Sequence, residues 1–296
     1  MRKIAYLTMA DKGDFVTDYH LSIEPMRALG WQVEEIPWRS DPDWNRYDAV
    51  YICTPWDYPE HSQQFLDVLN TIESSGALLI NDLGLVHWTL KKTYLRDVEQ
   101  RGSEIVPSTW YDNFESANPA EFFVEHQTDR VVIKPVVGAN AKDTFVLIDP
   151  IDDATLRMLR QTFADRAFLV QPFIENIQCE GEFSLFFFDG EYSHAIQKIP
   201  KAGDFRVQEE HGADIRPVSP TDTLLETAST LFSKIEPRPT YGRGDWVRDG
   251  NGRYLLMELE LIEPSLYLRT DSGAAARFAN ALNERFQVFA SKGSSS

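Results

Sequence analysis

Residues 250–266 (GNGRYLLMELELIEPSL) constrain the fold most, because they place two glutamates one residue apart inside an apolar run. In a β-strand, alternate side chains share a face, so Glu258 and Glu260 lie on one side, roughly 6–7 Å apart between their Cβ atoms. Leu259 and Leu261 then face a core. Two like charges on one face repel each other unless a positive group lies between them, and a divalent cation is the usual one. The segment therefore predicts a strand that binds a cation on one face.

A second strand precedes this one. Residues 241–249 (YGRGDWVRD) run into the turn sequence DGNG, a strong hairpin signal. With a two-residue turn, Asp245 lies opposite Glu258. Arg243 then lies opposite Glu260. A four-residue loop keeps the same faces, whereas a three-residue loop reverses them. Two of the three loops gather these charges on one surface, although a solvated acidic hairpin face balanced by an arginine fits the same residues.

Composition excludes several classes of protein. The 296 residues carry a formal net charge of −17, which argues against general affinity for nucleic acid. Cys53 and Cys179 lie far apart, in no metal-binding spacing, and are typical of reduced intracellular thiols. No apolar run reaches the roughly 18 residues of a membrane span, and no long apolar region opens the chain. We expect a cytoplasmic protein without a membrane partner, and a flexible tail at residues 291–296.

The first third of the chain alternates between strand-like and helix-like segments. This alternation predicts an open parallel α/β sheet. No G-x-G-x-x-G motif follows the first strand, so dinucleotide binding is not expected there. Strands are expected at residues 3–9, 31–38, 47–55 and 77–82, and helices at residues 21–30 and 62–76.

The loop TPWDYPEH, residues 54–61, follows an apolar strand at its carboxyl end. Open α/β sheets bind ligands at this edge. Trp56, Asp57, Tyr58 and His61 are therefore candidates for contact with a substrate. Asp57 would suit an ammonium group, and the two aromatic rings would limit the pocket to a small molecule. A proline-bracketed turn anchored by a packed tryptophan fits the same residues.

Two lysines are candidates for binding an anion. Lys92 belongs to a basic amphipathic segment, residues 86–102, for which we expect one helix ending at Gly102. Lys134 lies inside an apolar run and precedes the small-residue loop 138–141 (GANA). A buried lysine needs a partner, phosphate is a good one, and small residues let backbone N–H groups approach an anion closely. An ordinary hairpin loop would use the same small residues.

Residues 167–199 are expected to form a strand, an irregular link and a hairpin turning at Asp-Gly. The apolar stretch VQPFI, residues 170–174, could pair its backbone with a flat heterocycle. Glu182 is well positioned for a ribose hydroxyl, although ordinary strand ends fit both segments. The polar stretch that follows, residues 201–214, is unusually long for a compact domain and indicates a lid or binding loop. Lys198 and Arg206 are its cationic candidates.

In this order, the segments resemble an ATP-grasp ligase from about residue 81 to residue 284, and residues before them fit the pre-ATP-grasp domain. The chain is most similar to the glutathione-synthetase-like branch. Residues 181–214 and 255–268 resemble the subgroup of cycloserine-forming O-ureido-serine cyclo-ligases. Two departures stand out. Glu260 occupies a position where many members have asparagine, and the glycines that flank Arg243 predict a looser strand than the apolar pattern of the family.

The resemblance implies an α/β (α+β overall) ATP-grasp fold with an N-terminal open parallel α/β domain. It implies subdomains at residues 1–85, 86–170 and 171–290. ATP would lie between the last two. Catalytic roles fall to Arg206 and Arg243, which would hold the transferred phosphoryl group and the oxyanion, and Arg206 would also bind the substrate carboxylate. Mg²⁺, as two ions, would bind Asp245, Glu258 and Glu260. ATP would contact Lys92, Lys134, Gly138, Gln171, Pro172, Phe173, Ile174, Glu182 and Lys198.

The implied activity is ATP-dependent ligation. A small amino-acid-like carboxylate would become an acyl phosphate and then react with an amine-type nucleophile, either between molecules or by ring closure. A homo-oligomer is compatible with the sequence. Two alternatives are a non-catalytic ATP- and Mg²⁺-binding module, and a calcium- or partner-binding acidic hairpin. The second leaves the apolar surroundings of Lys134 unexplained.

Overall fold

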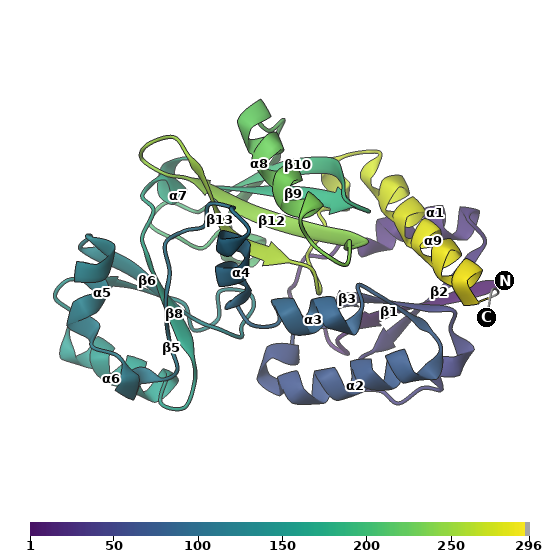
Figure 1. The fold of residues 1–296 in the computed structure, drawn as a ribbon, viewed down its shortest axis with the longest axis horizontal. Coiled ribbons are helices and arrows are strands. Elements are labelled where there is room, and N and C mark those ends of the chain that lie inside the picture. Colours follow the sequence, from purple (N-terminus) through teal and green to yellow (C-terminus); the bar gives the residue numbers. More distant parts are fainter. Residues whose placement is uncertain (294–296) are drawn as a thin grey trace.

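The protein is described by a computed structural model over residues 1–293, in which the strands form three sheets (Figure 1). Sheet A is parallel with strand order β2-β1-β3-β4, which confirms the predicted open parallel sheet. Its strands are β1 (Arg2–Thr8), β2 (Trp31–Pro37), β3 (Ala49–Thr54) and β4 (Leu78–Ile80).

Helices cover both faces of sheet A because its inner strands β1 and β3 are buried on both sides. Ile4 and Tyr6 pack toward α1 (Ile23–Ala28) and α9 (Ala274–Gly293). Alternate residues of β1 pack instead toward α2 (Ser62–Ser75), which ends at Gly76 with a left-handed φ of 92°. In Figure 1, α1 and α9 lie on one side of the sheet and α2 on the other.

Sheet B has strand order β11-β10-β9-β12-β13 and is antiparallel. The turn between β9 and β10 is the predicted Asp-Gly pair, with φ of 49° at Asp189 and 81° at Gly190. α8 (Asp222–Ser233) packs on the sheet through Phe232, whose ring stacks on that of Phe187 at 4.0 Å. The strands are β9 (Glu182–Phe188), β10 (Glu191–Ile199), β11 (Asp214–Pro217), β12 (Tyr241–Arg248) and β13 (Tyr254–Glu260).

Sheet C is antiparallel with strand order β5-β8-β6-β7. α5 (Pro119–His126) and α6 (Asp153–Thr162) cover one face around an aromatic core. A short helix, α7 (Asn176–Cys179), links sheet C to sheet B. The strands are β5 (Thr109–Tyr111), β6 (Arg130–Pro135), β7 (Phe145–Ile148) and β8 (Phe168–Pro172).

The predicted pairing of the acidic hairpin is confirmed, although its loop has a length that was expected to prevent this pairing. Asp245 pairs with Glu258 and Arg243 with Glu260. At the turn, however, the backbone N–H of Asp249 bonds to the carbonyl of Arg253, so the loop has the three residues expected to reverse the faces. A register shift after Asp245 inserts one extra residue into β13 and restores the pairing.

The glycines beside Arg243 mark tight packing, so the expectation of a looser strand is wrong. A Cβ atom on Gly242 would lie 2.6 Å from Leu261 Cδ2, and one on Gly244 would lie 2.2 Å from the Trp246 ring. Every residue of β12 except the last is buried. Glycine is required here because neighbouring side chains fill the space that a Cβ would need.

The single helix expected at residues 86–102 is also wrong. The chain forms α3 (Leu83–Thr89), capped by the Asp82 carboxylate, and then α4 (Tyr94–Gln100). Between them, the backbone N–H of Lys92 donates to the carbonyl of Val136 at 2.9 Å. This bond ties the break to the end of β6, so Lys92 lies on a connecting segment.

Sheets A and B share one aromatic junction. The ring of Tyr51 in β3 makes edge contacts with those of Tyr241 and Phe278, with centroids 5.0 and 5.1 Å away. Asn81, just after β4, has a φ of 57° and donates its amide to the carbonyls of Tyr241 and Leu261, each at 2.8 Å. Its side-chain oxygen accepts from the backbone N–H of Thr240. Asn81 therefore fixes the start of β12 to sheet A.

Part of the C-terminal tail that was expected to be flexible is helical. α9 reaches Gly293, so residues 291–293 of the expected flexible tail are helical, and residues 294–296 lie outside the described part.

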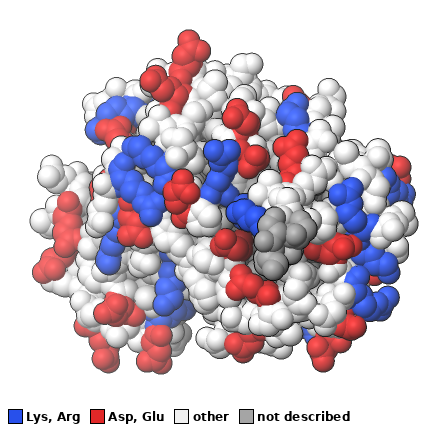
Figure 2. All heavy atoms as spheres, turned by 45° about the vertical axis from the view of Figure 1, so that its right-hand side comes forward, with Lys and Arg blue, Asp and Glu red and all other residues white. Residues whose placement is uncertain are grey.

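No helix in residues 1–293 has the length and apolarity needed to cross a membrane. On the face shown in Figure 2, acidic and basic side chains are interspersed. The subdomain boundaries stay a prediction.

Replacing Asn81 with alanine should destabilise the fold. The substitution leaves two carbonyls and one N–H buried without their partners, and each unsatisfied group costs about 1–3 kcal/mol. We expect the free energy of unfolding to fall by about 3 kcal/mol or more in urea titrations. Asn70→Ala is the control, since Asn70 makes one bond within α2, to the Leu66 carbonyl. Equal stability of the two variants would contradict the junction role of Asn81.

Candidate active site

One cavity collects residues from sheets B and C and from the loop that follows β3 of sheet A. It is lined by parts of β6 and β8 in sheet C, of β9, β10, β12 and β13 in sheet B, and by the loop after β3. The loop after Lys134 and the long loop between β10 and β11 also border it. The cavity brings together the following sequence-predicted residues: Trp56, Tyr58, Lys92, Lys134, Gly138, Gln171, Pro172, Phe173, Ile174, Glu182, Lys198, Arg206, Arg243, Asp245, Glu258 and Glu260.

Part of the lining is apolar and belongs to one cluster between sheets B and C. The Phe173 ring in this cluster is covered by the Arg130 guanidinium, whose carbon lies 3.9 Å from the ring centroid. Gln171 lies in β8, and its side chain donates to Ser108 Oγ at 2.8 Å. The apolar lining suits a flat heterocycle. Its members are Val106, Val132, Phe173, Ile174, Ile177, Phe205, Val207 and Met257.

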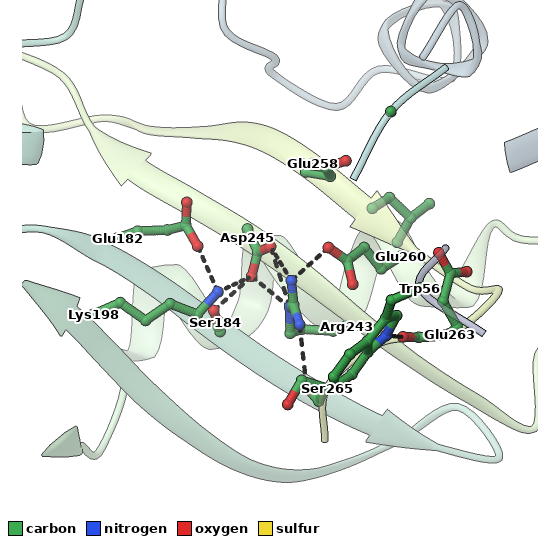
Figure 3. A network of polar contacts seen from close by, with 12 residues as sticks. Trp56, Glu182, Ser184, Lys198, Arg243, Asp245, Glu258, Glu260, Glu263 and Ser265 are labelled. Atoms are coloured by element: carbon green, nitrogen blue, oxygen red, sulfur yellow. Dashed lines mark hydrogen bonds and ion pairs between the residues drawn. The ribbon is translucent and has the colours of Figure 1, made fainter. Parts of the chain in front are cut away.

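Arg243 is the centre of the charged part (Figure 3). Its Nε and Nη2 atoms donate to the Asp245 carboxylate at 3.0–3.2 Å, and Nη2 also reaches Glu260 at 2.5 Å. Burial raises the pKa of Asp245, but Arg243 and Lys198 outweigh it and bring the pKa to about 2. Burial instead raises the pKa of Glu260 to about 7, and the nearby Glu258 adds to this shift although Arg243 opposes it.

A second ion pair lies beside this arginine. Lys198 and Glu182 face each other on β10 and β9, with Nζ 2.8 Å from the carboxylate, and Nζ also lies 3.5 Å from Asp245. Ser184 donates to Asp245 at 2.5 Å. Burial raises the pKa of Glu182, as does Asp245, although Lys198 lowers it. The bottom of the cavity is thus a continuous polar network.

Lys92 is the cation that pairs with Glu258. Its Nζ lies 2.9 Å from Glu258 and donates to the carbonyl of Gly138 at 2.8 Å. Burial raises the pKa of Glu258, but Lys92 and Lys134 outweigh burial and lower it. A Cβ atom on Gly138 would lie 2.8 Å from Pro135 Cγ, so the small-residue loop folds tightly against the end of β6. The break between α3 and α4 is what brings Lys92 here.

Lys134 is buried in β6 and lines the same cavity. Burial lowers the pKa of its ammonium group, while Glu258 opposes this effect. Among the ion pairs of residues 1–293, none includes Lys134, whereas Lys92, Lys198 and Arg243 each have a carboxylate partner. A buried cation without an ion-pair partner suits an anionic ligand.

The expected metal ligands have suitable donor chemistry, since carboxylate oxygens are the ligands that Mg²⁺ prefers. Within the described range, no three acidic, histidine or cysteine side chains are gathered closely enough to hold an ion. Each carboxylate is instead paired with a cation: Asp245 and Glu260 with Arg243, and Glu258 with Lys92. Arginine and lysine therefore compensate the like charges of this face, and metal binding by the three carboxylates stays a prediction.

The loop after β3 contributes only part of what was expected. Trp56 and Tyr58 line the cavity, but Asp57 does not. The Asp57 carboxylate accepts from Trp38 Nε1 at 2.6 Å and pairs with Arg39. The structure therefore does not bring Asp57 to the place where it could bind an ammonium group.

Arg206 lines the cavity, but its guanidinium group already pairs with a carboxylate of the same loop. Nε and Nη2 donate to the Asp204 carboxylate, at distances from 2.7 to 3.2 Å. Binding a substrate carboxylate would require Arg206 to leave this partner. The role expected for Arg206 stays a prediction.

Glu263 lines the cavity and had not been singled out. Its backbone carbonyl accepts from Trp56 Nε1 at 3.0 Å, and its carboxylate is hydrogen-bonded to Tyr58. Burial raises the pKa of Glu263 to about 8, and the neighbouring Glu260 adds to the shift. β13 ends at Glu260, so strand periodicity could not place Glu263.

Two parts of the chain match known protein families. Residues 4–81 match the N-terminal domain of D-cycloserine synthetase DcsG, and residues 102–241 match the ATP-grasp domain of prokaryotic glutathione synthetase. The cycloserine biosynthesis protein DcsG of Streptomyces lavendulae is 31% identical over 281 residues, which cover 90% of this chain and 92% of that protein. These matches confirm the resemblance inferred from the sequence.

Solved structures agree. The crystal structure of D-cycloserine synthetase DcsG superposes with a TM-score of 0.85 at 27% identity, covering 96% of this chain and 99% of that one. D-alanine–D-alanine ligase from Bacillus anthracis has a TM-score of 0.72 at 13% identity, with 99% and 100% covered, and so shares the fold. The predicted ATP-grasp fold is confirmed, and the chain belongs to the ATP-grasp carboxylate–amine ligases, in the family of DcsG.

Proposed function

We propose that this ligase activates the carboxylate of a small amino-acid derivative with ATP and closes a ring onto a nitrogen of the same molecule. The observation that carries the proposal is the likeness to DcsG over nine-tenths of both chains, which includes the N-terminal domain that supplies Trp56 and Tyr58. O-ureido-serine is the substrate that this proposal favours. The alternative reaction is ligation between two molecules.

The first step transfers a phosphoryl group. A substrate carboxylate oxygen attacks the γ-phosphorus of ATP, the bond to the β-phosphate oxygen breaks, and ADP leaves an acyl phosphate. Lys134 and Lys92 would neutralise the phosphates, because both line the cavity and Lys134 has no ion-pair partner in the described residues. The apolar cluster beside Gln171 to Ile174 would hold adenine, and Glu182 the ribose. Phosphoryl transfer needs mainly positioning and charge stabilisation from the protein.

The second step forms the ring. The substrate nitrogen attacks the acyl carbon, the carbon–oxygen bond to phosphate breaks, and the nitrogen loses a proton. Arg243, and Arg206 once released from Asp204, would stabilise the departing phosphate and the oxyanion. A closed cavity keeps water from hydrolysing the acyl phosphate. Nothing in this scheme requires a covalent bond to the protein.

ATP-grasp ligases use Mg²⁺, which neutralises phosphate charge when bound. Asp245, Glu258 and Glu260 would hold it, as two ions, once the incoming phosphates compete for Arg243 and Lys92. The donor chemistry fits, since all three supply carboxylate oxygens. The ion pairs with Arg243 and Lys92 describe how the same charges are balanced without a ligand.

Product analysis tests the proposed reaction directly. Incubation of the protein with ATP, Mg²⁺ and O-ureido-serine should release ADP and phosphate, and mass spectrometry should find an isoxazolidinone ring in the product. A panel of unmodified amino acids under the same conditions serves as the comparison. A product that joins two amino acids, with no cyclic product, would overturn the ring-closure proposal while leaving ligation intact.

Glu258→Gln should cut turnover strongly. The variant loses both a carboxylate ligand for the ion and the charge that positions Lys92, and removing one preorganised charge typically costs about 100- to 1,000-fold in kcat. ADP release under saturating substrate is the measurement. Glu104→Gln is the matched control, because Glu104 also pairs with one basic side chain, Arg253, but does not line the cavity. Near-normal turnover of Glu258→Gln would remove Glu258 from the metal site.

Lys134→Met should raise the KM for ATP and lower kcat. Methionine fills a similar volume but offers no charge to the phosphates, so binding should weaken by about tenfold or more. Lys234→Met is the control, since Lys234 is exposed, lies outside the cavity lining and donates its ammonium group to the Arg101 carbonyl. Unchanged ATP kinetics in Lys134→Met would make Lys134 a structural lysine.

A further inference from the structure

Glu263 differs from the other carboxylates that line the cavity and are not exposed to solvent. Glu182, Asp245, Glu258 and Glu260 each have a lysine or arginine partner. Glu263 has none in the part of the chain that the structure describes, and its carboxylate is hydrogen-bonded to the Tyr58 hydroxyl. A sheltered carboxylate that lacks a cation favours a ligand that supplies one.

The surroundings of Glu263 are rigid. Its backbone is fixed by the bond from Trp56 Nε1, and the Trp56 ring packs edge-on against Phe15 with centroids 5.1 Å apart. Tyr58 is buried and stacks on Phe65 at 4.5 Å. Figure 3 shows Glu263 beside Trp56, on the side of the network where Glu260 lies. The carboxylate is thus held at the end of the phosphate site by the loop after β3, where ligands collect in open parallel sheets.

We propose that Glu263, oriented by Tyr58, binds the α-ammonium group of the amino-acid substrate and selects substrates that carry one. This inference rests on the proposed function, because it assumes that an amino-acid derivative is the molecule activated. It also gives the cavity the ammonium partner for which Asp57 is not available, since Asp57 bonds to Trp38 and Arg39.

The assignment separates the α-nitrogen of the substrate from its other nitrogens. A nitrogen held as ammonium has no lone pair and cannot attack the acyl phosphate. Burial raises the pKa of Glu263 to about 8, so the carboxyl group holds a proton at neutral pH when no cation is near. A bound ammonium group lowers that pKa, and the ionised Glu263 in turn stabilises the ammonium form. The α-nitrogen is therefore the recognised group, and the nucleophile is another nitrogen, such as that of a ureido group.

The test compares two substrates in two proteins. O-ureido-serine and its des-amino analogue, 3-(ureidooxy)propanoic acid, differ only in the α-amino group. ADP release should show that the unaltered protein prefers O-ureido-serine. Glu263→Gln should raise the KM for O-ureido-serine by roughly 30-fold, the loss typical of one partner of a sheltered charge pair. The KM for ATP and the kinetics with the des-amino analogue should stay the same.

A Glu263→Gln variant that keeps the full preference for O-ureido-serine would overturn the proposal. Glu24→Gln is the control, because Glu24 is an exposed carboxylate paired with Arg27 on α1. Tyr58→Phe should reduce the same preference by several-fold, since it leaves the carboxylate in position without its hydroxyl partner.

Absence of ADP release with both compounds would count against the proposed function rather than against Glu263. Calorimetric binding of serine and of 3-hydroxypropanoate, each with ADP and Mg²⁺ present, then decides. A preference for serine that is lost in Glu263→Gln supports the assignment. Equal affinity of the unaltered protein for the two, or no binding of either, overturns it.

Discussion

The pairing of Arg243 with Asp245 and Glu260 is the interaction on which the site depends. It lies in β12, in the interior of sheet B, where every neighbouring strand is antiparallel. Burying an ion pair costs desolvation energy, so such pairs add little stability unless their hydrogen bonds are complete. Here the guanidinium is bonded to two carboxylates and to the Ser265 carbonyl. The arrangement is best understood as a preorganised charge site, and its tight packing explains why glycine flanks the arginine on both sides.

Much of the fold follows from short-range patterns. Alternating strands and helices predicted sheet A, and the spacing of Glu258 and Glu260 predicted their shared face. The hairpin shows the limit of such reasoning. Its three-residue loop should have turned the carboxylates into the core, and the bulge at Met257 that prevents this leaves no signal in the alternation of the sequence. The bulge depends on the two partner strands together, because β12 is fixed by β9 on its other side.

The site was less predictable than the fold because ligand contacts depend on which partner a charge finds. The sequence could nominate Asp57 and Arg206 by charge alone, yet each side chain finds an opposite charge nearby, on Arg39 and Asp204. Lys92 came from a helix that breaks to meet Val136, a contact across 44 residues that no local pattern encodes. Glu263 lies past the end of β13, where the alternation of a strand no longer predicts which way a side chain points. In each case the prediction would have required knowledge of a tertiary contact.

The cavity side chains that have no ion-pair partner indicate which groups a ligand should carry. Among the lining side chains that are not exposed, in the residues that the structure covers, Lys134 is the basic group and Glu263 the acidic group without an ion-pair partner. A polyanion satisfies the first and an ammonium group the second, so an ATP molecule and an amino acid together would neutralise what the protein leaves unbalanced. Neither ligand alone does so. Since each unpaired charge is costly to shelter, filling both positions should favour the closed, water-free state in which an acyl phosphate survives. Recognition of the substrate and protection of the intermediate would then have the same electrostatic origin.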